Sequence, residues 1–419
     1  MHKFNYRNNN LYCENVKIED IARKTGTPFY LYSHGTLIDH YRKLRAALAP
    51  VKPLICFSMK SNSNLAVCRS LVKEGAGLDI VSGGELFKAL KAGADPRKIV
   101  YASVGKTAME IDTAIRKNIL FFNIESIPEL VLIEKICKMR HRRARVSLRI
   151  NPDVKAHTHH FITTGISENK FGLNFNTAAE IFAKRNAFPH VDIIGLHMHI
   201  GSQIIQQAPF VNALRKLSLF VKALRANGAR IDYINIGGGM GIIYSNEQPQ
   251  TAKDYARAIL PILKSLKARI IIEPGRFISG NSGILVTKVL YVKEAHRKRF
   301  VIVDAGMNDL IRPALYDAYH EILPIKKNTN LRSIKADVVG PICESADFIA
   351  KDRKLPRFSE GDLLAVMSAG AYGFTMSSNY NSRPRAAEVM VTGNKFHVVR
   401  RRETYQDLIR GESIPGILK

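Results

Sequence analysis

Eight short apolar runs, each followed by a segment with helical periodicity, restrict the fold of this chain more than any other feature. The intervening segments are amphipathic and several end in glycine, as helix C-termini often do. Strands that alternate with helices in this way form a parallel sheet, and eight of them over roughly 225 residues form a (β/α)8 barrel. The runs begin at Ile55, Leu78, Ile99, Ile119, Val146, Ile193, Tyr233 and Arg269.

The pattern changes after about residue 280, where β-like runs continue with few long helical segments between them. This texture predicts an all-β domain, either a sandwich or a barrel. A strand-like run that starts at Pro28 precedes the first barrel strand. We therefore expect residues 1–31 to join the β domain, residues 32–280 to form the barrel, and residues 281–419 to form the rest of the β domain.

The composition is that of a globular protein with room for two domains. The chain has 419 residues, of which 46% are hydrophobic, so it can bury full cores. Its five cysteines are irregularly spaced and include no Cys-x-x-Cys pair, which indicates neither a disulfide framework nor a metal site. Signal-like segments and apolar runs of about 18 residues are absent. We expect a cytoplasmic protein with no membrane partner.

The large positive charge requires an explanation. Lysine and arginine number 63 against 36 acidic residues, a formal net charge of +27. Short basic clusters lie at residues 138–145, 293–299 and 400–402, without interleaved aromatic residues. A nucleic-acid binder would need a continuous basic stripe or a known binding motif. We therefore predict a cation-rich surface that favours anionic small substrates, and no nucleic-acid partner.

Polar and glycine-rich positions follow nearly every predicted strand. In a (β/α)8 barrel the C-terminal ends of the strands lie on one rim, and the active site forms there. These positions would therefore face one another in the folded chain. They are Lys60; Asp79 and Ser82–Glu85; Gly105 and Lys106; Asn123–Glu125; Arg149 and Asn151; His197, His199 and Ser202; Gly237–Gly241; and Glu273–Arg276.

Three of these features together indicate pyridoxal phosphate (PLP). The cofactor needs a lysine amine for its aldehyde, anion donors for its phosphate and a partner for its ring nitrogen. Lys60 supplies the amine, and the turn Gly237–Gly239 can direct successive backbone N–H groups at a phosphate. Glu273, at the end of an Ile-Ile-Ile run, can keep the ring nitrogen protonated. His199 could lie flat against the ring.

Motifs along most of the chain resemble those of the barrel-type PLP-dependent decarboxylases of basic and dibasic amino acids, and within that group the diaminopimelate decarboxylases. The resemblance runs from about residue 28 to 415. The motifs are SMKSNSNL, GLDIVSGGEL, NIESIPEL, ENKFGL, GLHMHIGSQ, IGGGMG, EPGRF, DAGMNDLIRPALYDAYH, GPICESAD and GAYGFTMSSNYNSRPR. The family more often has alanines around the lysine, where this chain has Ser58, Met59 and Ser61.

The resemblance implies a role for each matching residue around the cofactor. Lys60 would carry PLP, and His199 would stack on its ring. Glu273 would contact the ring nitrogen. The residues that would orient the lysine or contact the phosphate are Asp79, Glu85, Arg149, Ser202, Gly237, Gly238, Gly239, Pro274, Gly275, Arg276 and Tyr372.

The resemblance also implies a substrate and a reaction. Arg276, Arg312 and Tyr316 would bind the carboxylates of the substrate, and Glu344 would meet the distal ammonium. Tyr372, which would close over the phosphate, would also line the substrate site. Guanidinium groups and a carboxylate suit a substrate with an amino acid group at each end. Cys343 would return a proton to Cα after CO2 leaves. The implied activity is decarboxylation of meso-2,6-diaminopimelate to L-lysine, the last step of lysine biosynthesis, by a homodimer with active sites at the subunit interface.

Two alternatives stay open. The same chemistry could act on ornithine, arginine or carboxynorspermidine, although ornithine has no distal carboxylate and would not use a second guanidinium such as Arg312. The chain could also be a catalytically silent protein with the PLP-binding fold. Proteins of that class typically lose the cofactor lysine or the donor cysteine, and this sequence keeps both Lys60 and Cys343.

Overall fold

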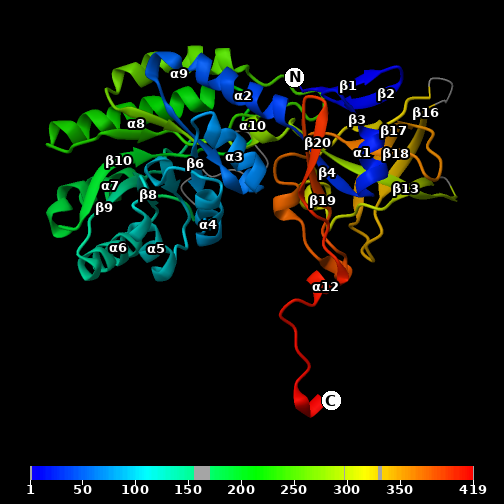
Figure 1. The fold of residues 1–419 in the computed structure, drawn as a ribbon. Coiled ribbons are helices and arrows are strands. Elements are labelled where there is room, and N and C mark those ends of the chain that lie inside the picture. Colours follow the sequence, from blue (N-terminus) through cyan, green and yellow to red (C-terminus); the bar gives the residue numbers. More distant parts are fainter. Residues whose placement is uncertain (1, 155–169, 297, 329–332, 419) are drawn as a thin grey trace. The chain divides into compact units, whose positions relative to one another are not determined.

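The chain divides into two compact units in the computed structural model (Figure 1). The barrel unit is Leu37–Ser279, and the β unit combines residues 1–36 with residues 280–419. Each unit is described by itself. Part of the ENKFGL motif, Glu168 and Asn169, lies outside the described residues. The structure describes residues 2–154, 170–296, 298–328 and 333–418.

Eight parallel strands of the described barrel unit close into a barrel, which confirms the fold predicted from the alternation. Each strand pairs with its neighbours in chain order, and the last pairs back to the first. The strands are β5 (Leu54–Ser58), β6 (Gly77–Ile80), β7 (Ile99–Tyr101), β8 (Phe121–Ile124), β9 (Ala144–Arg149), β10 (Val191–His197), β11 (Tyr233–Asn235) and β12 (Arg269–Ile272).

A helix follows every barrel strand, and most of these helices begin at a capping side chain. Asn, Ser or Thr at the N-cap accepts a hydrogen bond from a backbone N–H of the first turn. These N-caps are Asn64, Ser82, Thr107, Ser126, Asn174 and Thr251. The helices are α2 (His34–Ala47) before the barrel, then α3 (Leu65–Lys73), α4 (Gly83–Lys91), α5 (Ala108–Lys117), α6 (Ile127–Arg140), α7 (Phe175–Ala183), α8 (Ala208–Ala226), α9 (Ala252–Ser265) and α10 (Arg276–Ser279).

The barrel interior changes from apolar to polar along the strands. Phe121 and Ile271 belong to one buried apolar cluster near the strand beginnings. Side chains alternate along a strand, so the residue two positions further on faces the interior as well. Two positions on, Asn123 and Glu273 are hydrogen-bonded to each other across the interior at 3.3 Å. The polar layer at the C-terminal rim is therefore separated from the other end of the barrel by this apolar cluster, which we call the apolar plug.

The β unit includes the N-terminal strand that the sequence predicted for it. β4 (Phe29–Ser33) pairs antiparallel with β13 (Gly283–Ala295) and parallel with β19 (Ala387–Thr392). Phe29 and Leu31 of β4 belong to the buried apolar cluster of this unit. The remaining strands are β1 (Phe4–Arg7), β2 (Asn10–Cys13), β3 (Val16–Lys17), β14 (Lys298–Val303), β15 (Ile322–Pro324), β16 (Ser333–Val339), β17 (Phe348–Pro356), β18 (Leu363–Val366) and β20 (Lys395–Arg400).

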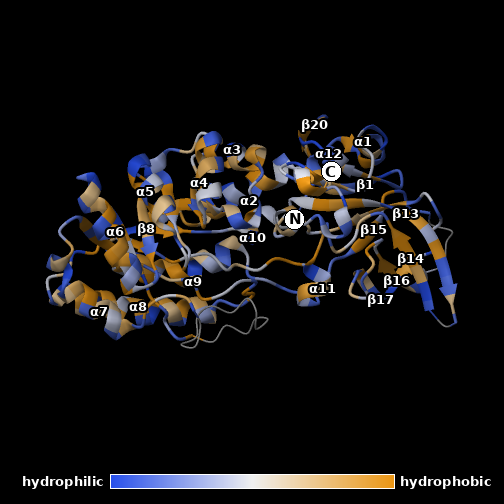
Figure 2. Cartoon of the chain, turned by 90° about the horizontal axis from the view of Figure 1, so that it is seen from below, coloured by the Kyte–Doolittle hydropathy of each residue, from blue (hydrophilic) through white to orange (hydrophobic). Residues whose placement is uncertain are grey.

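Short helices complete the β unit, and one basic cluster of the sequence occupies a hairpin. β13 and β14 pair antiparallel, and the hairpin is largely hydrophilic toward its tip (Figure 2). The described residues of this cluster, 293–296, 298 and 299, lie there. Among the described residues, no helix combines the length and the apolar character needed to cross a membrane. The helices are α1 (Ile18–Thr25), α11 (Arg312–Tyr316) and α12 (Tyr405–Leu408).

Candidate active site

Lys60 lies in a single helical turn, Met59–Ser61, directly after β5. This turn packs against the loop that follows β12, because the Ser58 N–H donates to the Pro274 carbonyl at 3.2 Å. A Cβ added to Gly275 would stand 3.0 Å from the Ser61 Cβ. Lys60 is exposed at the rim. The structure thus places the predicted cofactor lysine beside the Glu273–Arg276 segment.

Three titratable groups lie within electrostatic reach of Lys60. Burial raises the pKa of Asp79 well above its usual value, the charge of Glu273 raises it further, and the charge of Lys60 opposes both. Burial also raises the pKa of Glu85, again against the charge of Lys60. His199 responds in the other direction: burial and then the charge of Lys60 lower its pKa well below the usual range. The imidazole of His199 is therefore neutral at pH 7.

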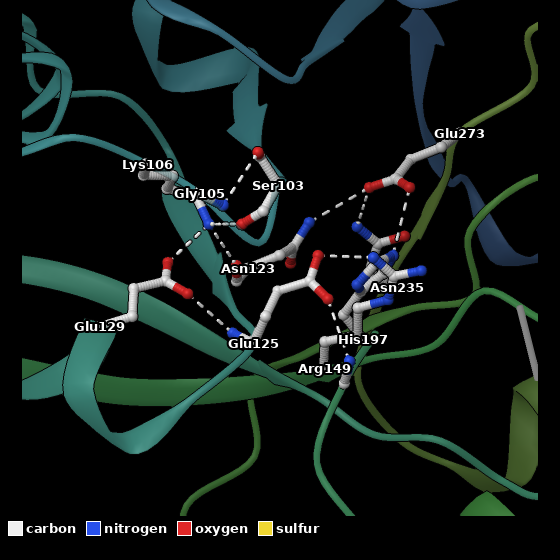
Figure 3. Close-up of polar contacts among 11 residues, drawn as sticks. Ser103, Gly105, Lys106, Asn123, Glu125, Glu129, Arg149, His197, Asn235 and Glu273 are labelled. Carbon is white, nitrogen blue, oxygen red and sulfur yellow. Dashed lines mark hydrogen bonds and ion pairs between the residues drawn. The ribbon is translucent and has the colours of Figure 1, made fainter. Parts of the chain in front are cut away.

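Glu273 is held by three side chains that come from three different strands (Figure 3). Its Oε1 accepts hydrogen bonds from Asn235 Nδ2 at 2.5 Å and Asn123 Nδ2 at 3.3 Å. Its Oε2 lies 3.2 Å from His197 Nε2. Burial alone would raise the pKa of Glu273, but the charge and hydrogen bond of His197 and the bond from Asn235 outweigh it and lower the pKa to about 2. Glu273 is thus an ionised carboxylate in a buried position.

The turn Gly237–Gly239 has no room for side chains. A Cβ on Gly238 would lie 2.2 Å from the Glu273 carbonyl oxygen, and one on Gly239 would lie 2.6 Å from the Gly201 carbonyl oxygen. Gly237 and Gly239 also have φ of +67° and +116°, which other residues rarely adopt. The backbone of this turn is therefore fixed close to the ends of β10 and β12, as a phosphate-binding turn requires.

His199 lies against the same turn. Its Nδ1 accepts a hydrogen bond from the Gly238 N–H at 3.3 Å, and a Cβ on Gly237 would lie 3.1 Å from the His199 Cβ. This contact fixes the orientation of the ring, because Nδ1 acts as the acceptor and the proton of the neutral imidazole is then on Nε2.

Arg276 and Ser202, both predicted phosphate contacts, lie next to each other. Arg276 is buried, and its guanidinium donates to Ser202 Oγ at 3.0 Å and 3.3 Å. The same guanidinium donates to Tyr244 Oη at 2.6 Å. Tyr244 could not be predicted from the sequence, since a tyrosine several residues beyond the glycine turn carries no motif signal.

Arg149 takes part in a buried ionic network on this rim. It donates to Glu125 Oε1 at 2.5 Å, and Glu125 Oε2 accepts from the Gly172 N–H at 3.0 Å. Phe171 covers the guanidinium, with 4.7 Å between the guanidinium carbon and the ring centroid. The charge of Arg149 contributes to the low pKa of His199. The orienting role that the resemblance implies for Arg149 stays a prediction.

A second buried ionic pair, Lys106 with Glu129, is connected to this network. Lys106 is buried and donates to Glu129 Oε1 at 2.5 Å and to the Asn123 carbonyl at 2.8 Å (Figure 3). Glu129 in turn accepts from the Glu125 N–H at 2.9 Å. Lys106 and Asn123 were placed on this rim from the sequence without a role, whereas Glu129 and Asn235 were missed. The structure links Lys106 to Glu273 through Asn123.

The β unit holds the predicted proton donor, Cys343, and four predicted substrate residues, Arg312, Tyr316, Glu344 and Tyr372. Arg312 is buried and bonds His320 Nε2 at 2.9 Å. Cys343 is exposed, and its backbone N–H donates to Asn381 Oδ1 at 2.8 Å. Tyr372 has a φ of +56°. That these residues share one site with Lys60 stays a prediction.

The loop that carries Cys343 is held by a buried carboxylate. Asp347 accepts hydrogen bonds from the N–H groups of Ile342 and Met307, both at 2.6 Å. Burial raises the pKa of Asp347, and these two bonds oppose the shift. Glu344 accepts a hydrogen bond from Tyr380 Oη at 3.0 Å. The loop thus presents the thiol of Cys343 and the Glu344 carboxylate on an exposed, well-supported turn.

Comparison with known proteins identifies the family. The model of the pyridoxal-dependent decarboxylases, pyridoxal binding domain, matches residues 34–280, which confirms the predicted class of cofactor. The diaminopimelate decarboxylase of Vibrio cholerae is 46% identical over 416 residues, which cover 99% of each chain. This chain belongs to the diaminopimelate decarboxylase family.

Solved members of the diaminopimelate decarboxylase family have the same fold. The Helicobacter pylori enzyme, complexed with L-lysine, is 43% identical and superposes with a TM-score of 0.91 over 94% of this chain and 98% of that chain. The M. jannaschii enzyme, in co-complex with L-lysine, is 36% identical, with a TM-score of 0.95 over 100% and 99% of the two chains. The recognition made from the sequence motifs is confirmed.

The residues at the barrel rim fit the cofactor of this family. The glycine turn forms a cradle that side chains would fill, and Ser202 and Arg276 supply donors beside it. One carboxylate oxygen of Asp79, Oδ1, is buried without a hydrogen-bond partner among the described residues, and the Lys60 amine supplies positive charge nearby. Among the described residues there is no group of three or more His, Cys, Asp or Glu side chains that could hold a metal ion.

Proposed function

We propose that this chain catalyses the PLP-dependent decarboxylation of meso-2,6-diaminopimelate to L-lysine and CO2. One observation carries the proposal: in a member of the diaminopimelate decarboxylase family, the Lys60 turn, the glycine turn and an ionised Glu273 lie on one rim. The two lysine-bound relatives support L-lysine as the product. The proposed place of the reaction is the last step of lysine biosynthesis.

The barrel unit would hold the cofactor. Lys60 would bind it covalently through the side-chain amine, and Ser202 and Arg276 would contact its phosphate together with the turn Gly237–Gly239. PLP, when bound, supplies an electron-accepting ring that allows a bond at Cα to break. Glu273 would keep a proton on the ring nitrogen, since its low pKa makes it an anion that favours the protonated ring.

Two further residues of this rim would restrict the cofactor. His199 is neutral and fixed by the Gly238 N–H, so it can lie against the ring without adding positive charge beside Lys60. Asp79 is held by a 2.6 Å hydrogen bond from Ser58 Oγ, close to the Lys60 amine. We assign both to orientation, together with Glu85, which accepts from the Val81 N–H at 2.8 Å.

The β unit would supply the substrate contacts and the proton. Arg312 and Tyr316, with Arg276 of the barrel unit, would bind the two carboxylates of the substrate, and Glu344 would bind the distal ammonium. Cys343 would donate a proton to Cα after CO2 departs, for which an exposed thiol on a supported loop is suited. Tyr372 would lie over the phosphate.

We also propose that the protein acts as a homodimer in the cytoplasm. By the resemblance, the loop with Cys343 and Glu344 completes the active site of the partner subunit. All five cysteines are free thiols, which is typical of proteins in a reducing compartment.

Two substitutions test the assigned roles. Lys60→Ala should abolish the visible absorbance of bound PLP and lower kcat by at least about a thousandfold, because the covalent attachment is lost. Cys343→Ala should keep the absorbance and lower kcat about a hundredfold, within the range of general acid catalysis. Absorbance spectra and CO2 release would be measured side by side. Undiminished turnover in either variant would contradict the role given to that residue.

The substrate is tested by offering rival amino acids to the same preparation. Release of CO2 from meso-diaminopimelate should exceed release from ornithine, arginine and carboxynorspermidine, because ornithine and arginine leave one of the arginine contacts without a carboxylate. The reaction should depend on added PLP after the cofactor is removed. Preferred turnover of ornithine would transfer the proposal to that substrate, and no turnover of any of the four would favour a silent binding protein.

A further inference from the structure

A basic cavity lies at the end of the barrel opposite the candidate active site. It has a volume of about 1430 Å³ and is lined by residues that precede or begin the barrel strands. Parallel strands all start on the same side of a barrel, so these residues converge on one opening. We call this cavity the basic cup. Its Lys and Arg residues are Lys52, Arg97, Lys98, Arg143, Arg145, Arg185, Arg230, Lys267 and Arg269.

The cup has an apolar floor and a cationic wall. Leu54, Leu120, Ile194 and Ile271 line it and belong to the apolar cluster that closes the barrel interior, or pack against it. The nine Lys and Arg residues are accompanied by only two acidic lining residues, both aspartates, a net formal charge of +7. The apolar plug of the barrel interior therefore closes the cavity on its inner side, and the outer side is open to solvent.

Several of the cup cations have partners within the chain. Arg230 pairs with Asp232 at 2.7 Å, and Arg143 pairs with Asp192. Arg185 donates to the Phe182 carbonyl at 3.0 Å, a carbonyl in the last turn of a helix. The contact of Arg185 stabilises the fold, because cations are favourable at helix C-termini, which lie at this end of the barrel. Arg97 pairs with Asp95 at 3.2 Å, and Arg269 donates to Tyr233 Oη at 3.0 Å.

The remaining four cations of the cup differ from these. Lys52, Lys98, Arg145 and Lys267 form no ion pair among the described residues of the chain. Lys52 and Lys267 are exposed, and Arg145 is half-buried in β9. Four uncompensated positive charges around one cavity repel one another, and an anion that binds among them would remove that repulsion.

We propose that the basic cup binds a small polyphosphate anion, of the class of nucleoside triphosphates and inorganic polyphosphates. Lysine and arginine are the side chains that bind phosphate groups, and several phosphates in one ligand would engage several walls of the cup at once. The cavity exceeds the roughly 300–1000 Å³ of most small-molecule sites, so a triphosphate with a nucleoside fits. The cations surround a concavity and do not form an extended stripe, which favours a compact ligand over a nucleic acid.

Calorimetry with the PLP-loaded enzyme tests the proposal, since loaded cofactor blocks its own phosphate cradle. Inorganic tripolyphosphate should bind wild-type protein saturably, with one ligand per chain. The triple variant K52Q/R145Q/K267Q should bind at least about tenfold more weakly, because charge-assisted contacts are among the stronger polar interactions. Its decarboxylase activity should stay unchanged, since these residues lie at the opposite end of the strands, and this also verifies the fold.

A matched variant separates the cup from the general positive charge. K135Q/K222Q/K253Q removes three exposed lysines of α6, α8 and α9 that do not line the cup, and its affinity should stay within about twofold of the wild type, as expected when only distant, screened charges change. Equal weakening in both triple variants would show nonspecific attraction and overturn the proposal. So would the absence of saturable binding, or binding that disappears once PLP is loaded.

Two further ligands define the class. ATP that binds more tightly than tripolyphosphate would show that the nucleoside is recognised as well, and equal affinity would identify the phosphates as the ligand chemistry. Both results support the proposal. A single-stranded RNA of 20 nucleotides that bound the cup at lower concentration than either ligand, with the same loss in K52Q/R145Q/K267Q, would replace it with nucleic-acid binding.

Discussion

At the scale of single residues, Glu273 shows how the surroundings decide the chemistry of a side chain. A buried carboxylate normally becomes harder to ionise. Here the charge and hydrogen bond of His197 and the hydrogen bond from Asn235 lower the pKa of Glu273 to about 2. The proposed ring-nitrogen partner therefore stays an anion throughout the physiological pH range.

Substitution of Asn235 tests this account. Asn235→Ala removes one of the groups that lower the pKa of Glu273, so the pKa should rise and the carboxylate should take up a proton at a higher pH than in the wild type. The loss of kcat on acidification should then begin at a higher pH. Rates between pH 4 and 8 would show the shift. Asn227→Ala, an exposed position outside the site, is the control, and coincident profiles for all three proteins would contradict the assignment.

At the scale of elements, the glycine turn after β11 connects two strand ends. Gly237 accepts the Glu273 N–H through its carbonyl at 2.8 Å, and Gly238 lies so close to Glu273 that a Cβ would overlap its carbonyl oxygen. The phosphate cradle and the ring-nitrogen partner are thus positioned by one contact between β11 and β12. A change in the turn should therefore alter both the phosphate cradle and the position of Glu273.

Gly238→Ala tests the turn. The new methyl group would lie 2.2 Å from the Glu273 carbonyl oxygen, and backbone atoms cannot yield without moving the turn away from β12. The affinity for PLP should fall at least about tenfold, in line with a strain of about 1–3 kcal/mol for overpacking. Absorbance titration of the apoprotein with PLP measures it. Gly84→Ala, where the nearest atom would be 3.8 Å away, is the control, and equal affinities in both variants would refute the contact as a determinant.

At the scale of the whole molecule, the proposed chemistry draws on both units. Lys60, Glu273 and the glycine turn belong to the barrel unit, and Cys343 and Arg312 belong to the β unit. In a symmetric dimer each active site could take its lysine from one subunit and its cysteine from the partner subunit. Two variants that are each inactive alone should therefore complement each other in a mixed dimer, which measurements on one variant at a time cannot show.

Mixing two inactive variants tests the shared site. Lys60→Ala and Cys343→Ala, unfolded together and refolded at equal concentration, should regain up to about a quarter of wild-type activity, since half of the dimers are mixed and each has one intact site. Each variant refolded alone is the control and should stay inactive. Two different affinity tags would verify that the mixture contains mixed dimers. If activity is not recovered in such a mixture, both residues of a site lie on one chain.

The sequence alone determined the barrel and the rim on which its site lies. Alternation of apolar runs and amphipathic segments dictates parallel strands with helices between them. The segments that end those strands must then meet, as Ser58 and Pro274, the neighbours of the Lys60 turn and of Glu273, do. Local patterns cannot specify which side chains meet across the barrel. Asn123 of β8 reaches Glu273 after β12, although these strands are not neighbours. The convergence of cations in the basic cup likewise depends on closure, because only the closed barrel brings residues far apart in the chain within electrostatic distance.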